Sequence, residues 1–261
     1  MEVSLRKQHV LAEAIKRGQF RAGMAHIATL ILGDPKYWRP ASSIDFRKNG
    51  ISSFQSLAEL LQRLLPNFTP SEIEHAINFV ENSLEKGLTM DQKRPHFPEV
   101  WNAGKNLQLL LASLIILTKP RFVVETGTAN GASAAAITWA LKENGMGHLW
   151  SFDIVDANPT LVPIDLLEYA TFERVSGNAA QLKERIKSFK ESDGTSVFLH
   201  DSDHSYLGQE SDYQTALNLD FDYIVSDDVD TSLAFTDFAR NEGLVIFDAP
   251  KFIGVARGKV N

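Results

Sequence analysis

The sequence of 261 residues contains no cysteine. Disulfide bonds, thiolate nucleophiles and zinc sites built on sulfur are therefore excluded. Positive charge is also scarce, because 26 lysines and arginines stand against 33 acidic residues and leave a net charge of -7. Broad, salt-dependent binding of nucleic acid requires a basic surface, so we expect no nucleic-acid partner.

Long hydrophobic runs are missing as well. The most apolar stretch, residues 109–117, is interrupted by Ala112 and Ser113 and is too short to span a bilayer. The N-terminus carries charges and has no apolar segment followed by small residues, so we expect no signal peptide, no membrane partner and a cytoplasmic location. A hydrophobic content of 44% with 23% charged residues is ordinary for a globular protein with a sizeable core.

Residues 1–97 are expected to form a helical region. A capping box at residues 69–72 has proline at the first helical position, which predicts a helix start. This region would serve as a lid or as an oligomer contact, so a homo-oligomer is possible. Apolar residues recur at helical spacing in three sets, namely Phe20, Met24, Ile27 and Ile31; Phe54, Leu57, Leu61 and Leu64; and Ile73, Ile77, Val80 and Leu84, with Gly87 as a stop.

Residues 98–261 are expected to form a second domain of the α/β class. After a helix over residues 100–117, β-rich runs alternate with helical patterns, which predicts a parallel sheet with helices on both faces. Too few residues separate the last two runs for a crossover helix, so they predict an antiparallel hairpin that closes a Rossmann-like sheet. The expected strands are 122–125, 149–153, 172–175, 197–200, 223–226, 244–247 and 252–256, and the expected helices are 133–141, 161–169, 179–189 and 207–217.

The segment from Glu125 to Gly131, Glu-Thr-Gly-Thr-Ala-Asn-Gly, follows the first of these strands and is the predicted cofactor loop. Gly127 and Gly131 let the backbone turn tightly and approach a ligand. The loop lacks the middle glycine of G-x-G-x-x-G, and Glu125 would repel a pyrophosphate but attract a cationic amino group. S-adenosylmethionine (SAM) offers such a group. We expect Thr128 and Ser133 to join these residues in binding SAM.

Two further strand ends extend the predicted cofactor site. Asp153 ends the second strand of the domain, where a carboxylate can accept hydrogen bonds from both ribose hydroxyls. Asn178 follows the third strand, after Gly177, and would lie beside the adenine. The alternative is that these glycines and acids merely mark strand ends, since turns favour both.

Acidic residues gather after the fourth and fifth strands of the domain. Asp201 follows one strand, and Asp227 and Asp228 follow the other, so the three carboxylates could converge at one sheet edge. Such a cluster needs protonation or a cation, and oxygen ligands select Mg²⁺ or another hard divalent cation. His204, three residues after Asp201, is chemically suited to act as a general base.

Some neighbouring residues have simpler interpretations. Asp203 and Asp230 could be no more than helix caps, which aspartates after strands commonly are. The side chain of His200 is expected to point into the packing of the sheet. Trp101 and Lys105 could flank the site, but an amphipathic helix with a snorkelling lysine is the simpler interpretation.

The patterns Glu-Thr-Gly-x-x-x-Gly, Asp-x-Asp-His-Ser-Tyr and Ser-Asp-Asp resemble those of the metal-dependent class I SAM-dependent methyltransferases. Within that family, the branch with the macrolide sugar O-methyltransferases and the cephalosporin-biosynthesis methyltransferase-like proteins is the most similar. The resemblance covers roughly residues 101–258. Family members often carry glutamate-aspartate where this chain has Asp227 and Asp228.

The resemblance implies a role for each matching residue. Asp201, Asp227 and Asp228 would hold a divalent cation, with Asp201 also beside the cofactor, and His204 would be the general base. The cofactor contacts that it implies are Glu125, Gly127 and Asp153.

The expected function is a SAM-dependent, divalent-metal-assisted O-methyltransferase that acts on a hydroxyl of a sugar or another small secondary metabolite. One alternative is an oxidoreductase with a nucleotide cofactor on the same sheet, which the missing middle glycine and the closing hairpin disfavour. Another is a non-catalytic scaffold that binds the cofactor. A scaffold has no need to hold three acids together beside a histidine, so His204 and the aspartates disfavour it.

Overall fold

The computed structural model describes residues 44–85, 97, 102–156, 159–190, 193–248 and 251–258. The helix expected from Phe20 to Ile31, the stop at Gly87 and Trp101 lie outside these residues. In chain order the elements are η2 (Arg47–Asn49), β1 (Ser52–Phe54), α3 (Leu57–Leu64), α4 (Pro70–Glu85), α5 (Lys105–Thr118), β2 (Phe122–Thr126), α6 (Ala132–Asn144), β3 (His148–Asp153), η4 (Ile164–Tyr169), β4 (Ala170–Arg174), α7 (Ala179–Lys187), β5 (Ser196–His200), α8 (Tyr206–Asn218), β6 (Tyr223–Ser226), α9 (Ala234–Phe238), β7 (Leu244–Asp248) and β8 (Lys251–Arg257).

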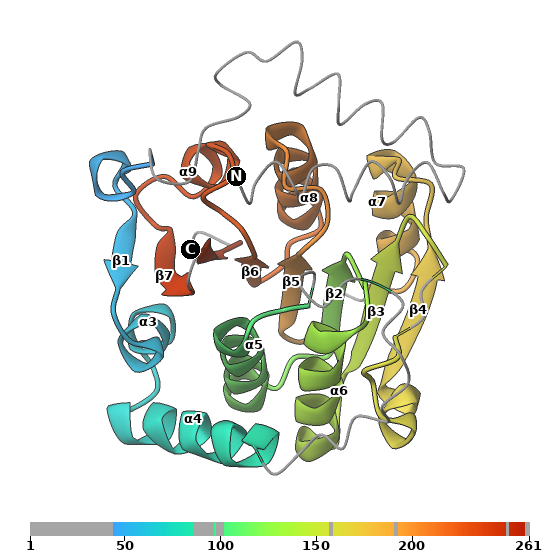
Figure 1. The fold of residues 1–261 in the computed structure, drawn as a ribbon, viewed down its shortest axis with the longest axis horizontal. Helices are drawn as coiled ribbons and strands as arrows, with labels where there is room; N and C mark the ends of the chain where they lie inside the picture. The colour runs from blue at the N-terminus through green and yellow to red at the C-terminus, as the bar shows by residue number, and fades with distance from the viewer. Residues whose placement is uncertain are drawn as a thin grey trace.

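The strands form one sheet in the order β1-β7-β8-β6-β5-β2-β3-β4 (Figure 1). Neighbouring strands run parallel except β8, which is antiparallel to both β6 and β7. This is the mostly parallel, Rossmann-like sheet with a closing hairpin that the sequence predicts. The seven predicted strands lie within two residues of the observed bounds, while β1 and α9 were not predicted.

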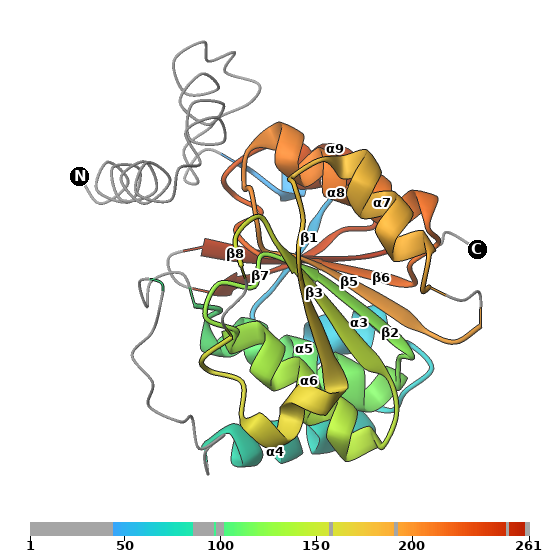
Figure 2. The same cartoon turned by 90° about the vertical axis from the view of Figure 1, so that its right-hand side faces the viewer.

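Both faces of the sheet are buried. Figure 2, which views the sheet edge-on, shows α7, α8 and α9 on one face and α3 to α6 on the other. The side chains of a strand alternate between the two faces. On β2, Val123 therefore packs into the core between the sheet and helices α5 and α6. Val124 packs into the core between the opposite face and helices α8 and α9. Burial on both sides explains why the strands are near-continuous apolar runs.

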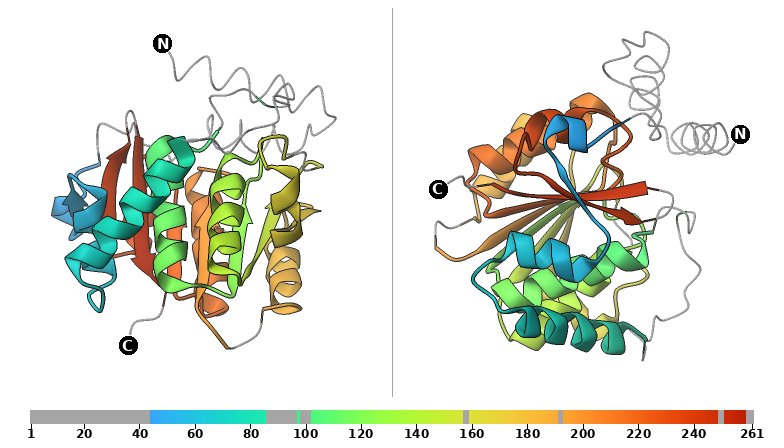
Figure 3. Two further views of the ribbon diagram at one scale, coloured as in Figure 1. Left: turned by 90° about the horizontal axis from the view of Figure 1, so that it is seen from below. Right: turned by 90° about the vertical axis from the view of Figure 1, so that its left-hand side faces the viewer.

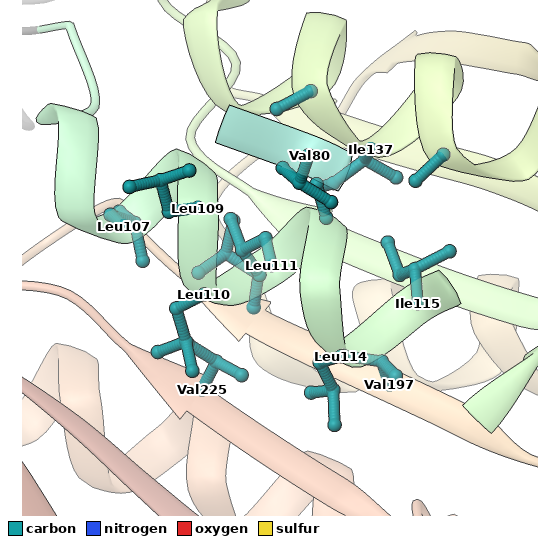
Figure 4. Packing of buried hydrophobic residues seen from close by; sticks show 14 of the residues in the cluster. Val80, Leu107, Leu109, Leu110, Leu111, Leu114, Ile115, Ile137, Val197 and Val225 are labelled. Carbon is teal, nitrogen blue, oxygen red and sulfur yellow. The ribbon is translucent and has the colours of Figure 1, made fainter. Parts of the chain in front are cut away.

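Helix α5 is apolar on nearly all sides because it is enclosed by protein. Figure 4 shows Leu110 and Leu114 of α5 close to Val225 and Val197 of the sheet. On its other side α5 packs against α4, so α4 forms an outer layer on this face (Figure 3).

The expected division at residue 97 does not separate two cores. Helices α3 and α4 contribute Leu61 and Val80 to the same buried cluster as α5, and β1 pairs with β7 at the edge of the sheet. Phe54, expected on a helix, ends β1 instead. The described part of residues 1–97 is therefore built into the α/β fold, as an edge strand and an outer layer of helices.

The predicted helix start at residue 70 is confirmed. The backbone N–H of Thr69 donates to Glu72 Oε2 at 2.7 Å, and the N–H of Glu72 donates to Thr69 Oγ1 at 3.3 Å, which is the reciprocal capping box.

Within the described residues, we find no helix with the length and apolar character that a membrane span requires.

Candidate active site

The carboxyl ends of β2, β3, β5 and β6 meet at one edge of the sheet. The backbone N–H of Gly127 donates to Phe152 O at 2.8 Å, that of Asp201 donates to Thr126 O at 2.9 Å, and that of Asp227 donates to His200 O at 3.0 Å. Each residue that follows a strand is thus held beside the end of its neighbour. This register brings the predicted cofactor loop and the acidic residues to the same edge.

The loop after β2 depends on its two glycines. Gly127 and Gly131 have φ angles of 94° and 86°, in the left-handed region that favours glycine. Asp153 Oδ2 accepts hydrogen bonds from the backbone N–H groups of Thr128 at 3.1 Å and Ala129 at 3.2 Å. The predicted loop and the predicted ribose carboxylate are therefore directly joined.

Glu125 is fully buried. Its two carboxylate oxygens accept hydrogen bonds from the hydroxyls of Ser133, in the first turn of α6, and Ser151, on β3. Ser151 is in turn 2.7 Å from the hydroxyl of Thr128. Burial raises the pKa of Glu125 from its ordinary 4.5 to about 7, although the two serine hydroxyls oppose the shift. Glu125, Thr128 and Ser133 thus form one hydrogen-bonded group under the loop.

The raised pKa of Glu125 makes stability depend on pH. The unfolded chain loses this proton near pH 4.5, whereas the folded chain keeps it until about pH 7. The folded state binds more protons in this window, so stability falls as the pH rises, by about 3 kcal/mol in total. We expect Glu125→Gln to remove this loss, so that its stability relative to wild type increases from pH 4.5 to pH 8 in urea unfolding. Glu74→Gln, an exposed change on α4, should follow the wild type; a pH-independent difference for Glu125→Gln would contradict the prediction.

Asn178 lies at the expected turn after β4 but has a structural task. Its Oδ1 caps α7 by accepting hydrogen bonds from the N–H groups of Ala180 at 2.9 Å and Gln181 at 3.4 Å. Beside this turn lies Ile154, which is 41% exposed and directly follows Asp153. A Cβ added to Gly177 would be 3.4 Å from Ile154 Cγ2. The apolar residue after the strand-terminal acid was a signal for this contact that the sequence analysis did not use.

Asn130 is a second loop residue that the sequence analysis missed. Its side chain is fully buried and bonds both backbone groups of Phe97, accepting from its N–H at 2.8 Å and donating to its carbonyl at 3.0 Å. It also donates to Asn102 Oδ1 at 2.8 Å. Asn130 therefore ties Phe97 and Asn102, which precede α5, to the predicted cofactor loop.

The predicted acidic cluster is present. Nε2 of His204 lies 3.8 Å from Asp201 Oδ1 and 3.6 Å from Asp228 Oδ2, and Asp227 follows the adjacent strand end with its side chain only 2% exposed. Burial and the nearby charge of Asp227 raise the pKa of Asp201 well above its ordinary range. Sequence analysis thus found four residues that the fold brings together.

The environment of His204 favours the neutral form of its imidazole. Burial lowers the pKa of its imidazole below the ordinary 6.5, although the nearby charge of Asp228 opposes the shift. A neutral imidazole has one nitrogen lone pair that can accept a proton. Its Nδ1 is buried and has no hydrogen-bond partner among the described residues, whereas Nε2 faces the carboxylates.

Of the residues with simpler interpretations, His200 lies where it was expected, but neither Asp203 nor Asp230 caps a helix, because Ser205 caps α8 and Asp230 binds the backbone of β8. His200 is fully buried and its Nδ1 is 2.7 Å from Asp212 Oδ2 on α8, so it belongs to the packing of the sheet. Asp203 Oδ1 accepts a hydrogen bond from the N–H of Ser205 at 3.1 Å, just before α8. Asp230 accepts one from the N–H of Phe252 at 3.1 Å, and Lys105 bonds Glu81 on the surface at 2.9 Å.

Lys251 is the principal residue that the sequence analysis missed. Its ammonium group forms an ion pair with Asp227 Oδ2 and lies 3.5 Å from Asp228 Oδ1. Burial lowers the pKa of Lys251, but the charges of Asp227 and Asp228 outweigh burial and raise it above its ordinary range. The described residues contain no group of three or more histidine or acidic side chains arranged to hold a metal ion. The residues present therefore do not fit the predicted Mg²⁺ site, because the ammonium group of Lys251 contacts Asp227 and Asp228, two of its three expected ligands.

Comparison with known proteins gave matches among solved structures alone, since neither a protein-family model nor a curated protein matches the sequence. The S-adenosylhomocysteine (SAH)-bound structure of CmcI is 18% identical with a TM-score of 0.38, over 49% of this chain and 62% of that chain. An SAH-bound methyltransferase from Podospora anserina is 11% identical with a TM-score of 0.45, over 76% of this chain and 92% of that one.

A third similar structure is TomG from Streptomyces achromogenes, an O-methyltransferase of tomaymycin synthesis in complex with SAM. It is 14% identical with a TM-score of 0.43, over 70% of this chain and 86% of that chain. Three structures of CmcI match over 49–62% of their own length. At such low identities and TM-scores, function must be argued from the geometry of the site itself.

Proposed function

We propose that this chain is a SAM-dependent methyltransferase that acts on a hydroxyl of a small molecule, such as a sugar or another secondary metabolite. The observation that carries the proposal is the juxtaposition of the glycine loop and the His204 cluster. Gly127 and Asp201 lie beside each other, since a Cβ on Gly127 would be 2.0 Å from the carbonyl oxygen of Asp201. A ligand on the loop is therefore adjacent to the half-buried imidazole of His204.

The chemistry around the loop suits SAM. Two carboxylates beside the loop, those of Glu125 and Asp153, accept hydrogen bonds, and carboxylates favour a cationic ligand with hydroxyls over a pyrophosphate. Asp153 is half-buried, and its carboxylate has about four acceptor positions; it gives three to backbone N–H groups at 3.1–3.2 Å, so capacity for a ribose hydroxyl remains. Ile154 and Asn178 beside it would flank the base. The full proposed contact set is Glu125, Gly127, Thr128, Gly131, Ser133, Asp153, Asn178 and Asp201.

In this proposal the cofactor brings the reactive group, and the chain has two tasks. Bound SAM supplies a methyl group that its sulfonium has already activated. The loop and the aspartates hold and orient the two substrates, which is the larger part of the catalytic effect for such a reaction. His204 takes the proton of the acceptor hydroxyl at Nε2, the nitrogen that faces the cluster. No step is assigned to a divalent cation, because the residues present do not fit one.

Titration of the protein with SAH and with NAD⁺ in a calorimeter tests the cofactor. We expect saturable binding of SAH and none of NAD⁺; the reverse result would favour the oxidoreductase. Transfer of a labelled methyl group to a panel of sugars and small alcohols then tests catalysis. Binding of SAH without transfer to any of them would favour the non-catalytic scaffold.

Asp153→Asn sharpens the cofactor test. Losing a charge-assisted acceptor costs about 1.5–3 kcal/mol, so we expect the Kd for SAH to rise by about tenfold or more. The matched control is Asp156→Asn, which removes the same charge from an exposed position three residues away and should leave the Kd unchanged. Equal effects of the two variants would show that only net charge matters, and no effect of either would remove Asp153 from the site.

A further inference from the structure

Lys251 occupies the place in the acidic cluster where a cation is needed. Its ammonium group pairs with Asp227 and lies 3.5 Å from Asp228 Oδ1. The lysine side chain is 18% exposed and the two carboxylates are 2% and 13% exposed, so solvent screens the three charges only weakly.

The backbone fixes this position. Lys251 is the first residue of β8 and pairs with Asp248 on β7. The next residue, Phe252, accepts a hydrogen bond at its carbonyl from the N–H of Val229 at 3.0 Å, and its own N–H donates to Asp230 Oδ1 at 3.1 Å. The start of β8 is thus bonded to the loop that carries Asp227 and Asp228. The contact follows from the register of the sheet as well as from the flexible lysine side chain.

A divalent cation would compete with this ammonium group. It would need the same carboxylate oxygens, and at contact distance the two positive charges would repel each other strongly in a buried site. The ammonium group also carries three N–H bonds. One of them is donated to Asp227 and Asp228 Oδ1 lies 3.5 Å from the nitrogen, so the group has the capacity to donate to a further acceptor oxygen.

We infer that Lys251 supplies the positive charge of the Asp201, Asp227 and Asp228 cluster from within the chain, so that the site works without a divalent cation. The part that concerns turnover rests on the proposed methyltransferase function. The part that concerns cation binding stands without it. The positive charge of Lys251 offsets the repulsion among the three carboxylates. Its ammonium group presents a donor to the oxygen of the hydroxyl substrate.

Binding of Mn²⁺, followed by the electron paramagnetic resonance signal of the free ion, tests the cation part. We expect no saturable site in the wild type. In Lys251→Met the unpaired carboxylates should bind one Mn²⁺ per chain at least about tenfold more tightly than the wild type, and adding Asp227→Asn should abolish this site. Lys142→Met, which breaks the exposed ion pair with Asp165, is the matched control and should gain no site.

If Lys251→Met does not fold, Mn²⁺ binding and methyl transfer by the wild type still test the inference. One tightly bound Mn²⁺ per wild-type chain would overturn it, and so would methyl transfer that EDTA abolishes and Mg²⁺ restores. The latter result would still support the methyltransferase. Conversely, no transfer at all together with no Mn²⁺ site would count against the proposed function and would support the cation part of the inference.

Discussion

Replacing His204 by alanine is expected to lower kcat for methyl transfer by about 10²–10⁴-fold, the usual contribution of a general base. Nε2 of His204 faces the carboxylates of Asp201 and Asp228 at 3.8 Å and 3.6 Å, and burial keeps the imidazole neutral and able to accept a proton. Within the described residues the His204 side chain contacts Asp201, Asp228 and His200 and not the glycine loop, so the Kd for SAH should stay close to that of the wild type. Steady-state kinetics and calorimetry measure the two quantities.

A role in proton transfer can be separated from a structural role. A base acts in the transition state, so kcat should fall with KM almost unchanged, and added imidazole should restore part of the turnover of His204→Ala. His75→Ala, an exposed histidine on α4, should match the wild type. Retention of near-wild-type kcat would place the base elsewhere. A loss of SAH binding in parallel with turnover would show that His204 supports the cofactor site or the fold.

Most of the fold could be predicted from the sequence because its signals are local. The apolar strands that precede Glu125, Asp153 and Asp201 are short, continuous runs between helical patterns, as buried parallel strands are. Strand β1 has no such signal. It has three residues, two of them serine, and exists through its pairing with β7, nearly 200 positions away. Helix α9 has only five residues and no full period to detect.

The candidate site also contains some residues that the sequence could predict and others that it could not. His204 and the three aspartates were predictable because parallel strands end at one edge, so residues after β5 and β6 must meet. Lys251 was not, because its place depends on the antiparallel register that sets Gly254 opposite Ser226 and carries the start of β8 past the end of β6. The burial of Glu125 likewise depends on which serines face it across β3 and α6, a tertiary fact that spacing along the chain does not contain.

Gly127→Ala is expected to disrupt both stability and cofactor binding. At a φ of 94° an alanine is strained, and its Cβ would lie 2.0 Å from the carbonyl oxygen and 2.5 Å from the carbonyl carbon of Asp201. Both atoms belong to the backbone, which cannot rotate away as a flexible side chain would. Strain and overpacking together should cost about 2–5 kcal/mol in urea unfolding. The displaced Asp201 should weaken SAH binding by at least about tenfold.

Gly145→Ala separates the two causes of this loss. Gly145 ends α6 with a φ of 63°, and a Cβ there would meet nothing within 4 Å. It therefore carries the conformational penalty alone, about 1–2 kcal/mol, and SAH binding should be unchanged. If Gly127→Ala cost no more than Gly145→Ala and bound SAH normally, the close approach of the loop to Asp201 would not be needed. The larger loss is expected because the loop and the His204 cluster approach each other closely at Gly127, and a methyl group placed there must push them apart.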